Sequence, residues 1–191
     1  MIYPDSFERK IGFDTVRREI DSRCLSPMGV RAASEISFST DAAAIAEALE
    51  ATSEMLSIVE GEEDLPFGTL ADFEALAGQI RVPGTFLTAQ ELYRLGASLA
   101  TVAAIHTFFV RHRDPDSGES AYPRLDLISQ GLTPFPAITS MLDRILDRYA
   151  EIRDNASPLL ADIRHRLQSM SGTVNAVMRR VMARAAADGV V

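Results

Sequence analysis

Asp162 and His165 are the two side chains of this sequence best spaced for metal chemistry. Residues three apart share a helix face, and a carboxylate with an imidazole at this spacing occurs in di-iron helical bundles. Those sites take such a pair from each of two helices, together with further glutamates. Here the pattern occurs once, and Arg164 and Arg166 flank the histidine. We therefore expect a solvated helix face and no metal.

The remaining nucleophiles and bases show no catalytic arrangement. His106 lies among apolar residues and is expected in the core or at its boundary, whereas His112 opens a polar loop and is expected to be exposed. Cys24 is expected to be a small buried hydrophobic residue. Lys10 is the one lysine and follows no glycine-rich loop, so the sequence lacks the phosphate-binding motif of nucleotide hydrolases. We expect no enzymatic activity and no bound cofactor from this chain.

Charge divides the sequence into two parts. The net charge is −8, but residues 157–191 carry a local +3 and residues 1–156 a local −11. Arg164, Arg179 and Arg180 are candidates for contact with a nucleic-acid backbone. The favoured interpretation is that they keep an apolar helix soluble, because an acidic body repels nucleic acid.

Helix signals recur along the chain, and no stretch shows the alternation typical of a strand. Thr88 and Glu91 form a capping box, and Ser26-Pro27, Asp41 and Ser157-Pro158 have the side chains that begin helices. The sequence predicts an all-α fold with helices over residues 13–24, 27–36, 41–59, 72–80, 89–111, 124–130, 136–149 and 157–188.

The last of these helices has a regular apolar seam. Its spacing alternates between three and four residues, which is the heptad pattern of helices that pack along their length. The seam consists of Leu160, Ile163, Leu167, Met170, Val174, Val177 and Val181. One interpretation is a core-facing helix of an antiparallel bundle. The favoured one is a projecting coiled-coil arm whose partner strand is expected downstream of residue 191 in the same protein, with residues 1–156 as a helical body and residues 157–191 as the arm.

Three segments resemble the N-terminal region of the second-type MutS proteins of bacteria. Cys24-Leu-Ser-Pro-Met-Gly29, with Ser39-Thr-Asp41, Ile45, Leu49 and Glu54, resembles the opening of that family. Gly84-Thr-Phe-Leu-Thr-Ala-Gln-Glu-Leu92 resembles a helix start of the family. Ile152-Arg-Asp-Asn-Ala-Ser-Pro-Leu-Leu160, followed by Ile163-Arg164, resembles its most specific motif in this region. The segment Asp114–Pro123 has no counterpart among these motifs.

The resemblance implies a fold and a set of partners. It implies a MutS core and lever region whose long helix leads to a clamp, in a longer homodimeric protein with an ATPase domain and, in many members, an Smr nuclease domain. ATP and magnesium would bind that ATPase domain, and the longer protein would act on DNA or on the ribosome. We therefore expect this chain to be a fragment of such a protein. The resemblance places no catalytic residue in it.

Composition adds an expected location. A single cysteine suits a reducing cytoplasm. The apolar stretch Leu99–Val110 is interrupted by polar residues, and no signal peptide is evident, so we expect a cytoplasmic protein without a membrane partner.

The leading functional hypothesis is a structural module that transmits movement from an ATPase to a clamp. The alternative is a free-standing helical module that captures a partner helix on its seam.

Overall fold

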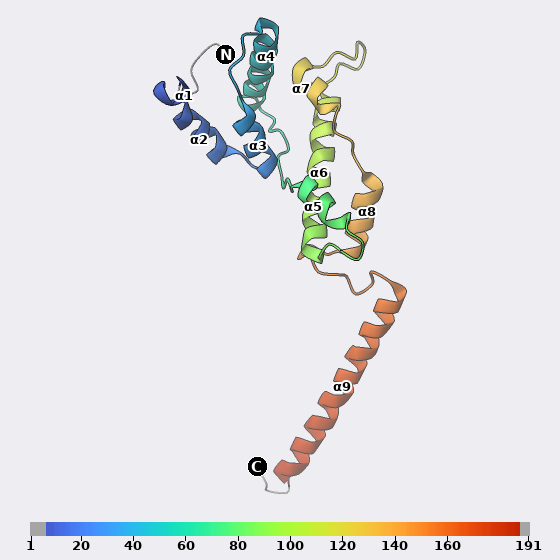
Figure 1. Cartoon of the computed structure of the whole chain (residues 1–191). Coiled ribbons are helices and arrows are strands. Elements are labelled where there is room, and N and C mark those ends of the chain that lie inside the picture. The colour runs from blue at the N-terminus through green and yellow to red at the C-terminus, as the bar shows by residue number, and fades with distance from the viewer. Residues whose placement is uncertain (1–6, 188–191) are drawn as a thin grey trace. The chain divides into compact units, whose positions relative to one another are not determined.

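The computed structural model describes residues 7–187, and within that range the chain is helical with no strand, which confirms the all-α prediction (Figure 1). The chain divides into two compact units, residues 1–139 and 140–191. The helices are α1 (Phe7–Lys10), α2 (Phe13–Arg23), α3 (Pro27–Glu35), α4 (Ala42–Val59), α5 (Phe73–Ile80), α6 (Ala89–Arg111), α7 (Pro123–Ser129), α8 (Pro136–Ile145) and α9 (Pro158–Ala187).

Two helix predictions were wrong in detail. The short helix α1 was not predicted, because four residues are too few to show a period. The helix predicted to continue to residue 149 ends at Ile145 instead, and Tyr149 lies in a turn. The predicted end of the last helix, at residue 188, falls outside the described part of the chain.

The predicted caps are present. Ser26 accepts a hydrogen bond from the amide of Gly29, and Asp41 accepts from the amides of Ala43 and Ala44. At the start of α6, Thr88 and Glu91 form the full capping box. Each cap satisfies amides that a helix start leaves without an internal partner, so these boundaries are fixed by local chemistry.

Arg17 joins the N-terminal helices. From α2, its guanidinium donates to the carbonyl oxygens of Ala33 and Ile36, both at 2.8 Å, at the end of α3. It also pairs with the Glu8 carboxylate at 3.2 Å and lies over the ring of Phe13. A cation at the carboxyl end of a helix satisfies free carbonyls and favours the helix dipole. One side chain therefore holds α1, α2 and α3 together.

Asp72 has two roles at the start of α5. It accepts from the amide of Ala75 at 3.2 Å as the cap of α5, and it pairs with Arg31 of α3 at 2.7 Å. The hydrogen bond from Arg31 lowers the pKa of the Asp72 carboxyl, and the Ala75 amide lowers it further. Because both partners favour the charged form, the cap also ties α5 to α3.

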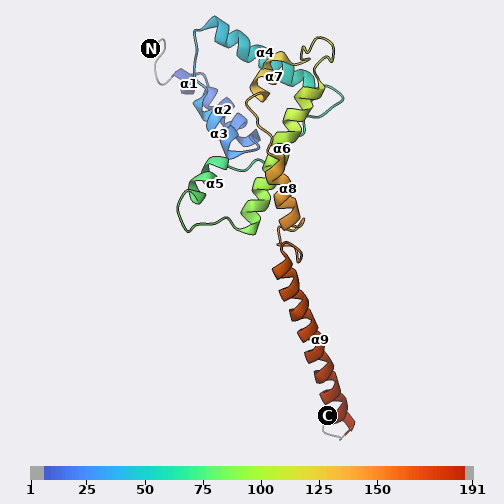
Figure 2. The same ribbon diagram turned by 90° about the vertical axis from the view of Figure 1, so that its right-hand side faces the viewer.

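The core lies where α4, α6 and α7 meet. Ile58, Leu65, Phe108 and Phe109 are buried together, and four half-buried residues pack on them: Met55, Ile105, Tyr122 and Leu125. Both views place α7 against α4 and against the carboxyl end of α6 (Figures 1 and 2). The short helix α7 is therefore the joint between two longer helices.

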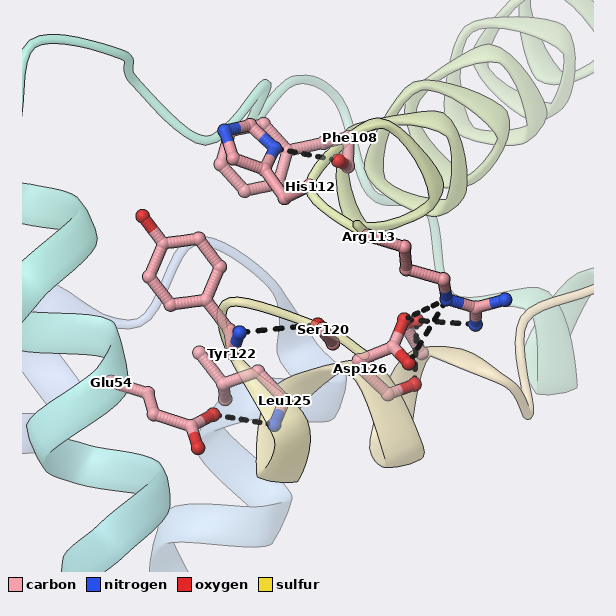
Figure 3. Close-up of polar contacts among 9 residues, drawn as sticks. Glu54, Phe108, His112, Arg113, Ser120, Tyr122, Leu125 and Asp126 are labelled. Atoms are coloured by element: carbon pink, nitrogen blue, oxygen red, sulfur yellow. Dashed lines mark hydrogen bonds and ion pairs between the residues drawn. The ribbon is translucent and has the colours of Figure 1, made fainter. Parts of the chain in front are cut away.

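Glu54 of α4 caps α7 from a distance in sequence (Figure 3). Its two carboxylate oxygens accept from the backbone amides of Arg124 at 3.0 Å and Leu125 at 2.9 Å. Tyr122, at the N-cap position of α7, makes no side-chain cap of its own. The Arg124 guanidinium returns to α4, where it pairs with Glu50 at 2.7 Å and Glu47 at 3.4 Å. One face of α4 is thus devoted to holding the first turn of α7.

Arg113 and Asp126 connect α6 to α7. The buried Asp126 carboxylate accepts from Nε of Arg113 at 3.2 Å and from Nη2 at 2.9 Å (Figure 3). Between these residues the chain reverses in a tight turn. The backbones of Arg113 and Ser120 form an isolated antiparallel β-bridge there, and Gly118 has a φ of 74°. The loop predicted over residues 114–123 is an ordered reversal, and it returns the chain to the N-terminus of α7.

The prediction that His112 is exposed was wrong. Its side chain is 24 % exposed, and its ring lies 4.2 Å from that of Phe108 and 5.6 Å from that of Tyr122, measured between centroids. Nδ1 donates to the Phe108 carbonyl oxygen at 2.8 Å, and Nε2 lies 3.5 Å from Glu63. The turn after α6 folds Tyr122 back over the histidine, which sequence proximity to a polar loop does not reveal. Cys24, expected to be buried, is half-buried.

Small residues let the segment before α5 lie close to α6. Ser98 is fully buried and accepts from the amide of Ala71 at 2.7 Å, while a Cβ at Gly68 would lie 2.5 Å from Oγ1 of Thr101. By length and composition α6 is apolar enough to cross a membrane. Its buried serine, threonine and phenylalanines make contacts within the first unit.

We predict that Glu54→Ala lowers the free energy of unfolding of the first unit by about 1–2 kcal/mol, because two amides of α7 lose their partner. Urea denaturation followed by circular dichroism measures the change. Glu50→Ala is the matched control, since it removes an exposed carboxylate from the same face and leaves the cap in place, and its effect should be smaller. Equal losses from the two variants would contradict the cap.

Candidate interaction surface

Within the second unit, Ser157 and Pro158 begin α9 as predicted. The Ser157 hydroxyl accepts from the amide of Leu160 at 3.2 Å, and Pro158 occupies the first helical position, where no amide is needed. The helix then runs for 30 residues to Ala187, a length of about 45 Å at 1.5 Å per residue. The predicted long C-terminal helix is confirmed.

A tight turn precedes α9. The backbones of Leu146 and Ile152 form an isolated antiparallel β-bridge. Oδ1 of Asp147 accepts hydrogen bonds from the amides of Tyr149 and Glu151, both at 2.9 Å. Ala150 has a φ of 61°, a left-handed conformation that costs a residue with a Cβ about 1–2 kcal/mol. The aspartate bonds hold the backbone there. We call residues 146–157 the elbow.

Two arginines fix the elbow to the helices on either side of it. Arg153 donates from Nε to the carbonyl oxygens of Leu146 at 2.6 Å and Asp143 at 3.1 Å, which closes the end of α8. Arg164, in the second turn of α9, donates to the Ile152 carbonyl oxygen at 3.0 Å and pairs with Asp154. The start of α9 is therefore held by side chains as well as by the chain connection.

The predicted seam faces solvent. Leu160 is half-buried, and the other six seam residues are between 43 % and 66 % exposed. Large apolar side chains in a continuous row are unusual on the surface of a monomer and mark a surface that contacts something else. The seam is therefore the candidate interaction surface, and its role as lever packing stays a prediction.

The three candidate arginines are not equivalent. Arg164 is engaged in the elbow, and its guanidinium already has two partners. Arg179 donates to the Asn175 carbonyl oxygen of its own helix. No ion pair joins Arg179, Arg180 or Arg184 to a carboxylate of residues 7–187. The distal arginines are thus available for a partner, and contact with nucleic acid stays a prediction.

The pair Asp162 and His165 stands alone. Asp162 lies 3.9 Å from Arg166, and His165 is exposed. Nowhere in residues 7–187 do three or more histidine, cysteine, aspartate or glutamate residues gather as they would to hold a metal ion. The described chain likewise offers no glycine-rich loop on which a nucleotide phosphate could bind.

Sequence reasoning missed the elbow as a structure. Asp147, Arg153 and Asp154 were not proposed as functional residues, although residues 152–164 form the most specific family-like motif. An aspartate whose side chain accepts from amides two and four residues onward is a turn signal that could have been found. The partners of Arg153 and Arg164 could not have been found in this way, because they depend on the path of the backbone.

The described residues are thus all-helical, and their long last helix starts at a side-chain-bonded turn and carries an exposed apolar seam. Proteins named Endonuclease MutS2 are similar to this chain. The protein from Leuconostoc mesenteroides is 25 % identical over 155 residues, and that from Alkaliphilus metalliredigens is 27 % identical over 155 residues; each match covers 81 % of this chain. The protein from Anaeromyxobacter sp. is 26 % identical over 181 residues, which is 94 % of this chain.

These matches confirm the resemblance to second-type MutS proteins as a distant one. No family model matches the sequence. The chain spans about a fifth of the length of the curated relatives, since the three matches cover 19 %, 19 % and 21 % of them. The similarity therefore concerns one region of a much longer kind of protein.

We predict that the elbow loosens in acid. Hydrogen bonds from the amides of Glu151 and Tyr149 lower the pKa of the Asp147 carboxyl, and Arg153 and Arg148 lower it further. A lowered pKa in the folded state means that the charged form stabilises the turn. This stabilisation is complete above the unfolded pKa of about 4, and it is lost as pH falls through the lowered value.

Hydrogen exchange at the amides of Tyr149 and Glu151, corrected for the intrinsic pH dependence of exchange, measures this opening. Protection should fall on acidification below about pH 4. In Asp147→Asn protection should be lower at neutral pH and should not change over that range. Equal acid sensitivity in the variant would show that another group controls the turn.

Proposed function

We propose that this chain is the core and lever module of a MutS-type ATPase that acts on DNA or on the ribosome. In this proposal the first unit anchors the module, and α9 is the lever that leads toward a clamp. The ATPase, with its ATP and magnesium, and any nuclease would lie in other parts of a longer, homodimeric cytoplasmic protein. The chain itself would be mechanical and would catalyse no reaction.

The elbow is the observation that carries the proposal. A helix transmits rotation only if its start is held, and here Arg164 and Ser157 hold the first turn of α9. Because α9 is about 45 Å long, a rotation of about 10° at the elbow would move its far end by about 8 Å. The similarity to MutS2 proteins over most of the chain supports placing this device in a MutS-type protein.

The elbow also gives a physical meaning to the motif over residues 152–164 that resembles one of that family. Of its residues, Arg153 closes α8, Asp154 pairs with Arg164, and Ser157 caps α9. A motif composed of residues that fix an angle suits a lever. It would have no evident use in a helix that only fills a core.

The exposed seam favours a second candidate, a free-standing module that binds a partner helix. Both candidates use the seam as a packing surface, and they differ in the gene sequence expected beyond codon 191. A coding sequence that continues into a Walker motif supports the lever. A stop codon directly after codon 191 would reject it and leave the binding module.

We predict that Arg164→Ala uncouples α9 from nucleotide in the longer protein. In a Cys24→Ser background, spin labels at Ser140→Cys and Gln168→Cys, both in the second unit, should report one narrow distance that changes when a non-hydrolysable ATP analogue binds. Loss of the elbow contacts should broaden that distribution and abolish the change. Basal ATP hydrolysis should persist, because in this proposal ATP binds in another part of the longer protein.

Arg166→Ala is the matched control for this experiment. Arg166 also lies in the first turns of α9 and also carries a positive charge, but its ion pair with Asp162 is exposed and lies within the helix. This variant should behave as the wild type. A nucleotide response that survives in Arg164→Ala would reject the elbow as the coupling point.

We also predict that the 191-residue chain binds duplex DNA weakly at most, with strong sensitivity to salt. The acidic body opposes binding, so any contact would come from the arginines of α9 and would weaken as salt concentration rises. Fluorescence anisotropy with a labelled duplex over a series of salt concentrations measures both properties. Tight binding that resists salt would contradict the charge argument.

A further inference from the structure

Both ring nitrogens of His112 have a partner. Nδ1 lies 2.8 Å from the carbonyl oxygen of Phe108, one turn earlier in α6 (Figure 3), and Nε2 lies 3.5 Å from a carboxylate oxygen of Glu63. Because a carbonyl oxygen can only accept a hydrogen bond, Nδ1 carries the hydrogen of the first contact. The neutral ring therefore has its lone pair on Nε2, the nitrogen that lies beside Glu63.

The charge on His112 determines the sign of its contact with Glu63. In the neutral ring, the lone pair of Nε2 and the carboxylate are two acceptors with no hydrogen between them, and they oppose each other. When Nε2 gains a proton, the same atom donates a charge-assisted hydrogen bond to the carboxylate. A histidine side chain changes its charge between about pH 5 and 8. The contact therefore changes from attraction to repulsion as the proton is lost.

The site accommodates a positive charge on the ring. His112 occupies the C-cap position of α6, where the helix dipole is negative. The ring centroids of Phe108 and Tyr122 lie 4.2 Å and 5.6 Å from that of the imidazole, and aromatic faces attract cations. Because the Glu63 side chain is 62 % exposed, the pair has the modest strength of a surface ion pair.

The other charged groups around this histidine have different roles. Arg113, the next residue along the chain, is held by Asp126 of α7 at 2.9 Å and so does not compete for Glu63. Arg111 and Asp64 line an open depression of about 530 Å³ together with Glu63. Arg111 makes no ion pair with a carboxylate of residues 7–187, so it is a cation to which Glu63 can turn when the imidazole is neutral.

The contact holds the segment through which the chain leaves α4. Glu63 lies in this segment, residues 60–66, between α4 and α5. Two residues further along, Leu65 belongs to the core cluster with Ile58 of α4 and Phe108 of α6. The contact therefore fastens the exit from α4 to the carboxyl end of α6 next to the core.

We propose that His112 and Glu63 form a proton-operated latch, which holds residues 60–66 against α6 when the histidine is charged and releases them when it is neutral. The latch lies within the first unit and does not rest on the proposed function. Because the closed form binds the proton, its stabilisation is present at mildly acidic pH and is lost as pH rises through the titration range of histidine. Below about pH 4 a glutamate is neutral, so the latch also opens there.

Hydrogen exchange in the 191-residue chain tests the latch. The amides of Gly61 and Phe67 donate to the carbonyl oxygens of Ile58 and Leu65, at 3.1 Å and 2.6 Å, on either side of Glu63. After correction for the intrinsic pH dependence of exchange, their protection should be about threefold higher at pH 5.5 than at pH 7.5. Equal protection at the two pH values would overturn the latch.

Two variants should remove the response to pH in opposite ways. Glu63→Ala lacks the carboxylate, so protection should be low at both pH values. His112→Gln supplies an amide that donates to Glu63 without a titrating proton, so protection should be high at both. Glu62→Ala removes an exposed carboxylate from the same segment and should respond as the wild type does. A response that persists in Glu63→Ala would show that another group controls the segment.

A double-mutant cycle separates the pair from all other effects of pH. Urea denaturation of the wild type, Glu63→Ala, His112→Ala and the double variant gives the coupling between the two side chains. At pH 5.5 this coupling should favour the folded state about threefold in the unfolding equilibrium constant, and at pH 7.5 it should disappear or change sign. A coupling of the same size at both pH values would overturn the proposal, because the contact would then not depend on the proton.

Discussion

The fold depends on the satisfaction of helix ends by side chains from elsewhere in the chain. At the joint between α4 and α7, Glu54 bonds the first free amides of α7, and Arg124 returns to α4 through Glu50. The apolar cluster beneath that joint has four buried members, which is a small core for three helices. A short helix such as α7 is marginal without tertiary support, so its capping by α4 determines whether the core beneath it can form.

The same solution recurs at three other places in the described chain. Arg17 closes the end of α3, Asp72 links α5 to α3, and Arg153 closes α8. Each contact uses a charged group at a helix terminus, where unsatisfied backbone groups and the helix dipole make a single side chain effective. Directional contacts of this kind set angles, whereas apolar packing alone leaves them adjustable. Contacts of this kind hold neighbouring helices within each unit in fixed orientation, as the proposed function requires.

The sequence was informative wherever structure is set locally. The helices and the caps at Ser26, Asp41, Thr88 and Ser157 follow from spacing and side-chain type within a few residues, and the structure contains them. The seam on α9 was found because a heptad is a local period. The partners of Glu54, Arg17 and Arg153 were not found, because each depends on chain segments brought together by folding. His112 was misplaced for the same reason, since the aromatic ring that covers it arrives only after the chain reverses.

The rigidity of α9 depends on its seam as much as on its elbow. An isolated helix in water is marginal even with favourable residues, and α9 contains valines along its seam and Gly172 near its middle, which lower its intrinsic stability. The elbow secures the first turns, but its contacts end at Arg164. Beyond that point helical order depends on burial of the seam against another helix. A helix of this composition is therefore stiff when its seam is covered and soft when it is bare, so under the proposed lever function whatever covers the seam would also control whether movement at the elbow reaches the far end.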